Sequence, residues 1–486
     1  MVLSSYNTQL GFNEGERDST GYWLQEDGSS INPSTWGGYK LRLPFQRVNH
    51  QLIQLRNLVY LNNQSSVELN LGYQNNMRRE YEESKLRPGL FLMLHTINYD
   101  IKYHLPDFKK WETTIGLNGM VQLNRNKGNE YLIPDYVQGD AGLFAITQKR
   151  WRKISFSAGV RGDLRSININ PLWMDSSGVP SKQGVAGADQ LFTAQHKFYG
   201  NATGNIGIAI NPLPELTLKL NIGSGFRTPT VSELASNGVH EGTLRYELGN
   251  QQLKPEYSIQ ADLGMAFTNA HITFEVAAFA NYIKRFTYAV KVLASTGGDS
   301  LPDPTQPIVL FTFTQHDALL IGGEATLDVH PHPLDWLHIE NTLSYVRGLL
   351  PGATKESQNL PFMPPLRWIC SLRAESDHLG KVLAHAYVGV ESDYHARQNF
   401  VLAYANTETV TPRYWLLNAS MGTDILVKGK KRLGIQLSAN NLLSISYQDH
   451  LSRWKYNGEN PLTGRTGIYN MGRNFVLKCI IPLYNR

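Results

Sequence analysis

The clearest signal in this sequence is an alternation of apolar and polar residues with the period of two that belongs to a β-strand. From Trp111 to Leu123 the odd positions are Trp, Thr, Ile, Leu, Gly, Val and Leu, and the even positions are mostly polar or small. The segment Phe91–Tyr103 shows the same alternation, and a short turn joins the two. Together they predict a hairpin with one apolar face.

The same unit recurs along the chain, at residues 154–161, 205–210, 216–223, 257–263 and 433–440. The polar partners are largely small or uncharged, which is typical of a wet lumen rather than of a fully solvated outer face. Several tryptophans fall at predicted strand ends, where the aromatic girdles of membrane barrels lie. They are Trp111, Trp151, Trp336, Trp368 and Trp415.

The links between the predicted strands alternate in length. Short links fall near residue 62 and at 105–109, 148–150, 211–215, 268–270, 330–334, 376–380 and 427–431. Long links fall at 11–45, 76–89, 124–134, 166–195, 224–254, 284–305, 347–361, 397–411 and 447–472. They separate eighteen strands, from residues 2–10 to residues 472–484. In an outer-membrane barrel the short set faces the periplasm and the long set the exterior.

We therefore predict an all-β, antiparallel transmembrane β-barrel that occupies residues 1–486 as one domain. We predict that these are eighteen strands of a barrel of about twenty-two, incomplete at its N-terminus, although the orientation of the first strand would agree equally with a complete eighteen-stranded barrel. Charged residues make up 18% of the chain and aromatic residues 10%, and the mean hydropathy is −0.32, as expected when only alternate residues are apolar. No apolar run reaches the roughly eighteen residues of a membrane-spanning helix.

Charge and cysteine content exclude some functions. The formal net charge is +5 and the basic residues are scattered, so nucleic-acid binding is not predicted. Cys370 and Cys479 each lie inside a strand pattern, in phase with lipid-facing residues, and are interpreted as small apolar side chains. Residues 1–15 lack the charged and apolar regions of an export signal.

The centre of the chain carries a recognisable motif. Residues 225–229 read GFRTP, and residues 249–256 read GNQQLKPE before an alternating strand. This resembles a motif of TonB-dependent outer-membrane receptors, in which a strand ends in G-F-R-A-P and a loop closes with G-N-x-x-L-K-P-E. The resemblance implies a structural role for Gly225, Phe226, Arg227, Pro229, Gly249, Asn250, Leu253 and Glu256.

Three further stretches resemble the same family, and the first of them resembles its Bacteroidetes-type branch. They are residues 43–57 with 69–83, LPFMPPLR at 360–367, and NLLSISYQDHLSR with MGRNFVLKCIIPLY at 441–453 and 471–484. The family also has a plug domain inside the barrel and a short box that contacts TonB, and neither is found in this sequence. The family usually ends on an aromatic residue, whereas this chain ends LYNR.

The resemblance implies a place in the Gram-negative outer membrane, in contact with its lipid and lipopolysaccharide, and no cofactor. It also implies capture of iron chelates, haem, vitamin B12, zinc or oligosaccharides by extracellular loops, with release driven by the TonB complex acting on the plug. Our leading hypothesis is a receptor for uptake of a metal chelate, either siderophore-bound iron, haem or zinc. Because the plug is not found, we expect this barrel portion not to transport on its own.

The long loop 224–254 offers four candidate ligand-binding residues, His240, Glu241, Tyr246 and Glu247. Imidazole and carboxylate suit zinc or iron, and phenolate suits ferric iron or haem. The metal itself is not specified by these residues. The alternative is a structural cap, in which Arg227, Glu233, Arg245 and Glu247 pair and hold the loop on the rim.

The late loop 447–472 offers His450, Arg453 and Trp454, beside further basic residues. A cationic and aromatic group of this kind suits an anionic chelate, and it suits lipopolysaccharide phosphate equally. In the early loop, Tyr22, Trp23, Trp36 and Tyr39 either stack on a sugar or chelator or pack the loop on itself.

Other clusters carry weaker signals. His330 and His332 in HPHP have a metal-binding spacing, but their short turn lacks two further ligands. Carboxylates expected near the lumen are Asp262, Glu275, Glu324, Asp328 and Glu375, which we expect to bind a plug or water rather than to act in acid–base chemistry.

No nucleophile elbow, phosphate loop or zinc signature is present in the sequence, so an enzyme is not predicted. Two alternatives to a receptor remain open. One is a surface-binding or adhesive outer-membrane barrel without transport. The other is a soluble all-β enzyme whose apolar faces meet in a sandwich or propeller.

Overall fold

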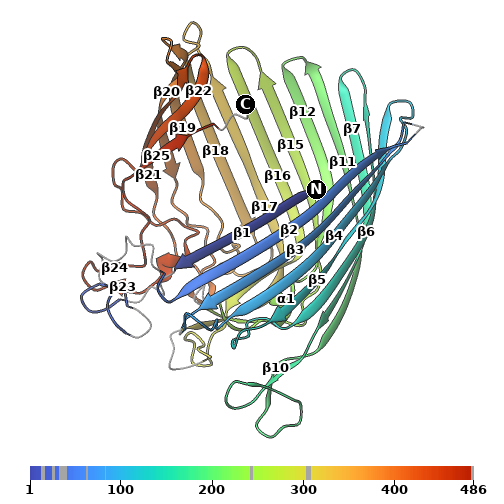
Figure 1. Cartoon of the computed structure of the whole chain (residues 1–486), viewed down its shortest axis with the longest axis vertical. Helices are drawn as coiled ribbons and strands as arrows, with labels where there is room; N and C mark the ends of the chain where they lie inside the picture. The colour runs from blue at the N-terminus through green and yellow to red at the C-terminus, as the bar shows by residue number, and fades with distance from the viewer. Residues whose placement is uncertain are drawn as a thin grey trace.

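The computed structural model describes residues 1–11, 17–24, 28–31, 41–61, 64–82, 84–240, 245–302 and 308–482. Long antiparallel strands curve into the wall of a barrel (Figure 1). The main sheet has 20 strands, of which β13 and β14 form a hairpin inside one long loop. Eighteen described strands therefore make the wall, and the predicted all-β antiparallel fold is confirmed.

Each wall strand pairs with the next wall strand in the chain. In chain order they are β1 (Val2–Gly11), β2 (Phe45–Tyr60), β3 (Ser66–Tyr81), β4 (Phe91–His104), β5 (Trp111–Asn126), β6 (Tyr136–Arg150), β7 (Ile154–Ile169), β11 (Gln195–Leu213), β12 (Leu216–Arg227), β15 (Glu256–Thr268), β16 (Ile272–Lys291), β17 (Val309–Val329), β18 (Leu337–Leu349), β19 (Arg367–Leu379), β20 (Leu383–His395), β21 (Tyr414–Val427), β22 (Lys430–Asn440) and β25 (Asn474–Ile480). Within the described residues, no ladder joins β25 back to β1.

Smaller elements lie in the long loops. They are α1 (Val231–Ala235), the 3-10 turns η3 (Tyr404–Asn406) and η4 (Arg453–Tyr456), and the short strands β8 (Leu172–Met174), β9 (Pro180–Ser181), β10 (Asp189–Phe192), β13 (Asn237–His240), β14 (Arg245–Leu248), β23 (Glu459–Asn460) and β24 (Arg465–Thr466). The long loops gather at the lower rim in Figure 1, and the short turns gather at the upper rim. Among the described residues, no helix is long and apolar enough to cross a membrane.

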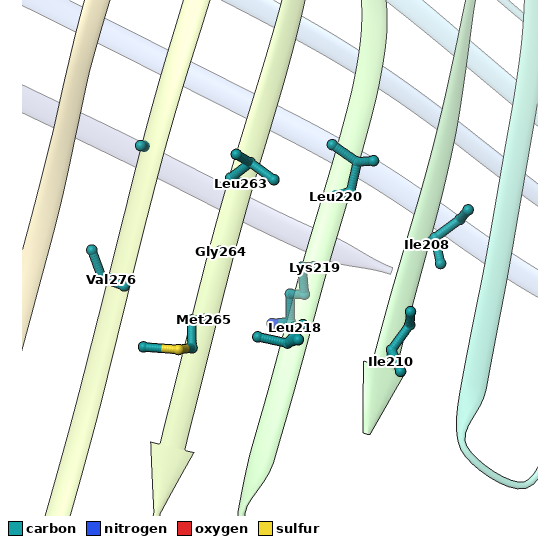
Figure 2. A pocket seen from close by; sticks show the side chains of 10 residues that line it. Ile208, Ile210, Leu218, Lys219, Leu220, Leu263, Gly264, Met265 and Val276 are labelled. Carbon is teal, nitrogen blue, oxygen red and sulfur yellow. The ribbon is translucent and has the colours of Figure 1, made fainter. Parts of the chain in front are cut away.

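The period-two pattern becomes two faces of the wall. Leu220 on β12 lies in register with Ile208 on β11 and with Leu263 on β15, so apolar side chains form bands across the strands. Figure 2 shows this outer face, where the side chains enclose a shallow apolar depression of about 460 Å³ beside Gly264. The side chain of Leu263 is 62% exposed, as expected for a residue that faces lipid.

The predicted end of one wall strand, β16, is wrong. The link expected at residues 284–305 begins later, because β16 continues to Lys291. A register shift between Ile283 and Phe286 lets the strand resume its pairing with β17, from Phe286 opposite His316 to Lys291 opposite Phe311. A β-bulge hides the continuation because it breaks the alternation that marks a strand in sequence.

The inner face carries little apolar packing of its own. The main cluster joins Tyr136 on β6 and Ile167 and Ile169 on β7 to residues of the loop that follows β12. These wall residues are out of phase with Leu143 and Leu164, which are exposed on the outer face, so they point inward. The core therefore sits inside the barrel, where this loop packs on the wall near the extracellular rim.

Candidate functional site

The loop between β12 and β15 is built around the short helix α1. Thr230 caps its first turn, since the Thr230 hydroxyl accepts a hydrogen bond from the Glu233 N–H at 3.2 Å and the Glu233 carboxylate accepts one from the Thr230 N–H at 2.8 Å. This capping box stabilises the turn. Val231 and Leu234 are buried against the inward-facing cluster around Ile167. The loop therefore folds into the lumen rather than away from the membrane.

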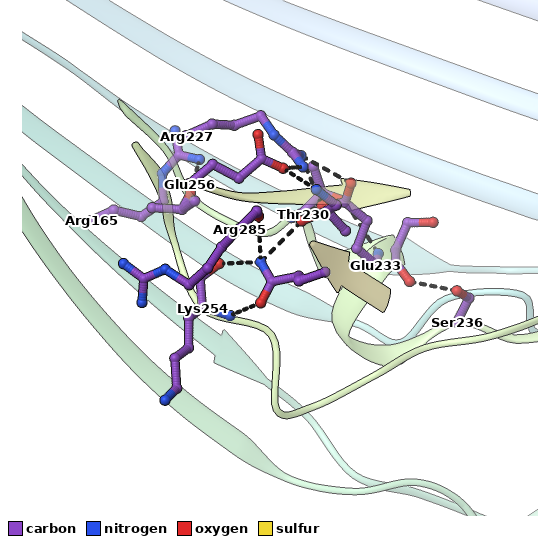
Figure 3. Close-up of polar contacts among 12 residues, drawn as sticks. Arg165, Arg227, Thr230, Glu233, Ser236, Lys254, Glu256 and Arg285 are labelled. Carbon is purple, nitrogen blue, oxygen red and sulfur yellow. Dashed lines mark hydrogen bonds and ion pairs between the residues drawn. The ribbon is translucent and has the colours of Figure 1, made fainter. Parts of the chain in front are cut away.

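Arg227 ties the two ends of this loop together (Figure 3). Its Nη1 donates to both oxygens of Glu233 at 2.9 Å, and its Nη2 donates to Glu256 at the start of β15. Glu256 is 6% exposed and also accepts a hydrogen bond from the Thr287 N–H at 2.9 Å. A planar guanidinium suits such a double contact. The GFRTP and GNQQLKPE halves of the motif thus meet through one arginine.

The other motif residues also make close contacts at this point. A Cβ on Gly249 would lie 2.3 Å from the backbone nitrogen of Ala235, so the helix approaches the chain directly there. Asn250 donates to the Phe313 carbonyl on β17 at 2.9 Å. The remaining members lie within the same packing: Gly225 against Ser258, Phe226 with its ring 5.4 Å from Tyr257, and the buried Pro229 and Leu253.

The hairpin of β13 and β14 carries the first group of candidate ligand residues. His240 Nδ1 lies 3.0 Å from Glu247 Oε1, and Arg245 Nε donates to the same oxygen at 2.8 Å. Glu247 is 4% exposed. Burial acts to raise the pKa of Glu247, but the contacts with His240 and Arg245 outweigh it, and the pKa is lowered. The buried Glu247 carboxylate is therefore ionised, with His240 and Arg245 as its two partners.

The wall holds this hairpin in place, because β14 pairs in parallel with β17 from Arg245 opposite Val309 to Leu248 opposite Thr312. The Tyr246 hydroxyl donates to Asn237 Oδ1 at 2.7 Å, and burial raises the pKa of this tyrosine. Glu241, the fourth residue predicted in this loop, lies outside the described residues. The structure thus places His240, Tyr246 and Glu247 on one hairpin.

The late loop places its histidine differently from its basic residues. His450 is 1% exposed, with Nε2 lying 2.8 Å from Glu408 Oε1 and Nδ1 lying 2.7 Å from Thr411 Oγ1. Glu408 also accepts hydrogen bonds from the N–H groups of Phe362 and Leu402. The ring of His450 therefore joins three long loops and is not presented at the surface.

Arg453 of the late loop packs against the loop that precedes β19. Its guanidinium carbon is 3.4 Å from the centre of the Phe362 ring. The pKa of Arg453 is lowered, first by burial and then by the positive charge of Arg245 on the central hairpin. Trp454 follows and is 39% exposed, which makes it more open to a ligand than His450 or Arg453 of the same loop.

The early loop is described only in part. Arg17 stacks on Trp23 with its guanidinium carbon 3.4 Å from the ring centre, so Trp23 packs within its own loop. Tyr22 is 47% exposed. Trp36 and Tyr39 lie outside the described residues.

Beneath the central loop the inner wall forms a polar hollow of about 620 Å³. Arg165 binds Asp140 through two hydrogen bonds of 2.6 and 2.7 Å and donates to Thr228 Oγ1 at 2.7 Å. Arg161 pairs with Asp163 nearby. Sequence reasoning missed these lumen pairs, because the strands alternate in the same way whether their inner residues are charged or neutral.

Comparison with known proteins identifies the family. The family model described as "TonB dependent receptor-like, beta-barrel" matches residues 3–442. The chain belongs to the TonB-dependent receptor β-barrel family. Proteins of this family reside in the outer membrane of Gram-negative bacteria, so the wall strands of this receptor-like chain span that membrane.

Solved structures share this fold at low sequence identity. The copper transporter OprC has 15% identity and a TM-score of 0.70, over 90% of this chain and 66% of its own. The FrpB iron transporter from Neisseria meningitidis has 11% identity and a TM-score of 0.66, over 98% and 68%. The ferric-catecholate import receptor Fiu from K12 E. coli has 12% identity and a TM-score of 0.65, over 98% and 71%. This chain thus spans about two thirds of the length of each.

Proposed function

We propose that this chain is the barrel of an outer-membrane receptor that takes up an anionic, aromatic metal chelate, of the class to which ferric catecholates and haem belong. The observation that carries the proposal is a pair of arginine–aromatic contacts, Arg453 on the ring of Phe362 and Arg245 on the ring of Phe311, which places cationic and aromatic groups together in the long loops. Transport is proposed to need a plug and the TonB complex, as the family resemblance implies.

The chemistry of the loop cluster supports this ligand class. Arg245 lies over the Phe311 ring at 5.1 Å and Arg453 over the Phe362 ring at 3.4 Å, so each cation sits on an aromatic face. A guanidinium so held offers its remaining N–H groups to carboxylate or catecholate oxygens. The exposed ring of Trp454 provides a stacking surface beside them. Structural relatives are named for copper, iron and ferric-catecholate transport, which supports a metal or a metal chelate as the ligand.

Binding is tested with a ferric-catecholate complex and with haemin on the purified full chain in detergent, followed by quenching of tryptophan fluorescence. Arg453→Gln is expected to weaken binding by about tenfold to a hundredfold, because a hydrogen bond to a charged group contributes on the order of 1.5–3 kcal/mol. Arg413→Gln, at an exposed arginine just before β21, is the matched control and should bind as the parent does. Equal binding by all three proteins would refute the site.

Uptake is tested in cells that carry the complete locus, with iron supplied only as the chelate. Loss of accumulation on deletion of the gene, and equally on deletion of TonB, is the expected result. A protein that binds the chelate while deletion leaves uptake unchanged is instead a surface-binding barrel without transport.

A further inference from the structure

A histidine-rich turn of the chain lies at the opposite rim from the ligand loops. His330 follows the last residue of β17, and His338 lies at the start of β18. The turn between these strands is one of the short links, so it belongs to the periplasmic rim. Its first residue is fixed to the neighbouring turn, because the His330 N–H donates to the His271 carbonyl at 2.7 Å.

Three side chains converge at this turn. Ligand atoms of Asp328, His330 and His338 all lie within 4.8 Å of one another. His330 Nε2 is 2.6 Å from Asp328 Oδ2, and the rings of His330 and His338 meet edge to face with centroids 4.3 Å apart. The sequence shows the HPHP pair but not this group, since His338 joins Asp328 and His330 only through the pairing of β17 with β18.

The group faces the lumen at the periplasmic mouth. Ile321 on β17 and Leu343 on β18 are exposed on the outer face. Asp328 and His338 are out of phase with them and so point inward. Asp328 and His330 are partly buried, with side-chain exposures of 22% and 33%. Water and ions in the lumen can therefore reach the group from one side.

Two observations indicate that this group has room for a ligand beyond its internal hydrogen bond. Asp328 Oδ1 is buried and finds no hydrogen-bond partner among the described residues, although Oδ2 is held by His330. An unsatisfied buried oxygen calls for a water or an ion. In addition, His338 Nε2 lies 3.1 Å from Glu375 Oε1, and the Glu375 carboxylate is paired with Arg373. A carboxylate that fixes an imidazole ring in this way is the usual support of a metal-bound histidine.

We propose that Asp328, His330 and His338 bind a divalent transition-metal ion, of the Zn²⁺ or Cu²⁺ class, at the periplasmic rim. A set of two imidazoles and one carboxylate binds Zn²⁺ or Cu²⁺ in preference to Ca²⁺ or Mg²⁺. A tetrahedral Zn²⁺ holds its ligand atoms about 3.3 Å apart, a spacing that small side-chain rotations provide here. Solvent completes the coordination. Glu375 is a positioning residue, and the bound ion cross-links the ends of β17 and β18.

The test is a titration of the full chain in detergent with Zn²⁺, followed by calorimetry, and with Co²⁺, followed by its visible absorption. The double variant H330A/H338A is expected to lose one equivalent of bound metal and the corresponding Co²⁺ bands. His332→Ala, in the same turn, is the matched control and should retain both, because His332 is not a member of the group. Glu375→Gln should weaken Zn²⁺ binding about tenfold or more.

Loss of folding is separated from loss of the site by Asp328→Asn, which keeps the shape of the side chain but removes a charged ligand. It should lower Zn²⁺ affinity while the circular dichroism spectrum stays unchanged. Full stoichiometry in the double variant, or displacement of Zn²⁺ by equimolar Mg²⁺, would overturn the proposal. None of these changes touches the extracellular loops, so chelate binding there should persist, and the two proposals can fail independently.

Discussion

His450 and Glu408 meet in the interior of the loop cluster, with Nε2 and Oε1 2.8 Å apart and no solvent exposure on either side chain. One residue follows β22 and the other precedes β21, so the contact joins loops that are far apart in sequence. Its burial indicates that His450 serves the architecture of the cluster. The residues left to meet a ligand are those around it.

Replacing one member of this pair should loosen the whole cluster. In His450→Ala, Glu408 keeps its two backbone donors but loses its side-chain contact, and removing the partner of a buried polar group costs about 1–3 kcal/mol. Hydrogen–deuterium exchange should rise in residues 398–411 and 447–472 and stay constant in the wall strands. His332→Ala, whose ring is 67% exposed, should leave exchange in both loops unchanged. Identical exchange in both variants would contradict a structural role for His450.

The close approach at Gly249 gives a second prediction. In Gly249→Ala the new methyl group would meet the backbone of Leu234 and Ala235, which belongs to α1 and cannot rotate away. The helix must shift, at a cost of about 1–3 kcal/mol that is typical of overpacking. Limited proteolysis should then cut residues 228–248 faster than in the parent. Gly298→Ala, where nothing lies within 4 Å, should show the parental rate.

Glu247 gives the hairpin a dependence on pH. Its pKa in the folded protein is lowered from about 4.5, so the ionised form contributes stability above that value. The contribution is lost as the pH falls below about 4.5 and through the lowered folded pKa. Amide exchange in residues 237–240 and 245–248 should therefore accelerate in that acidic range.

The variant Glu247→Gln isolates this effect. Amide exchange in the hairpin of this variant should be fast at neutral pH and should change little further on acidification. Glu459→Gln, at an exposed carboxylate of the late loop, should keep the parental pH profile. A parental profile in Glu247→Gln would mean that another group controls the hairpin.

The wall was predictable from the sequence because each strand repeats a local rule. Alternation located strands such as β5 and β12, and Gly- and Asn-rich loops marked their ends. The continuation of β16 beyond the bulge near Phe286 was not predicted, because the bulge interrupts the alternation. The site was harder to predict, since it depends on contacts between loops. Nothing near Phe362 or Glu408 in sequence indicates that they surround Arg453 and His450.

The parallel pairing of β14 with β17 bears on how a ligand is met at this surface. Four residues of the hairpin are bonded to the wall through their main chain. A chelate that docks against Arg245 of this hairpin thus meets a group whose backbone freedom was already lost when the barrel folded. Little further entropy is lost on binding, and affinity then depends on chemical fit rather than on the ordering of a loop.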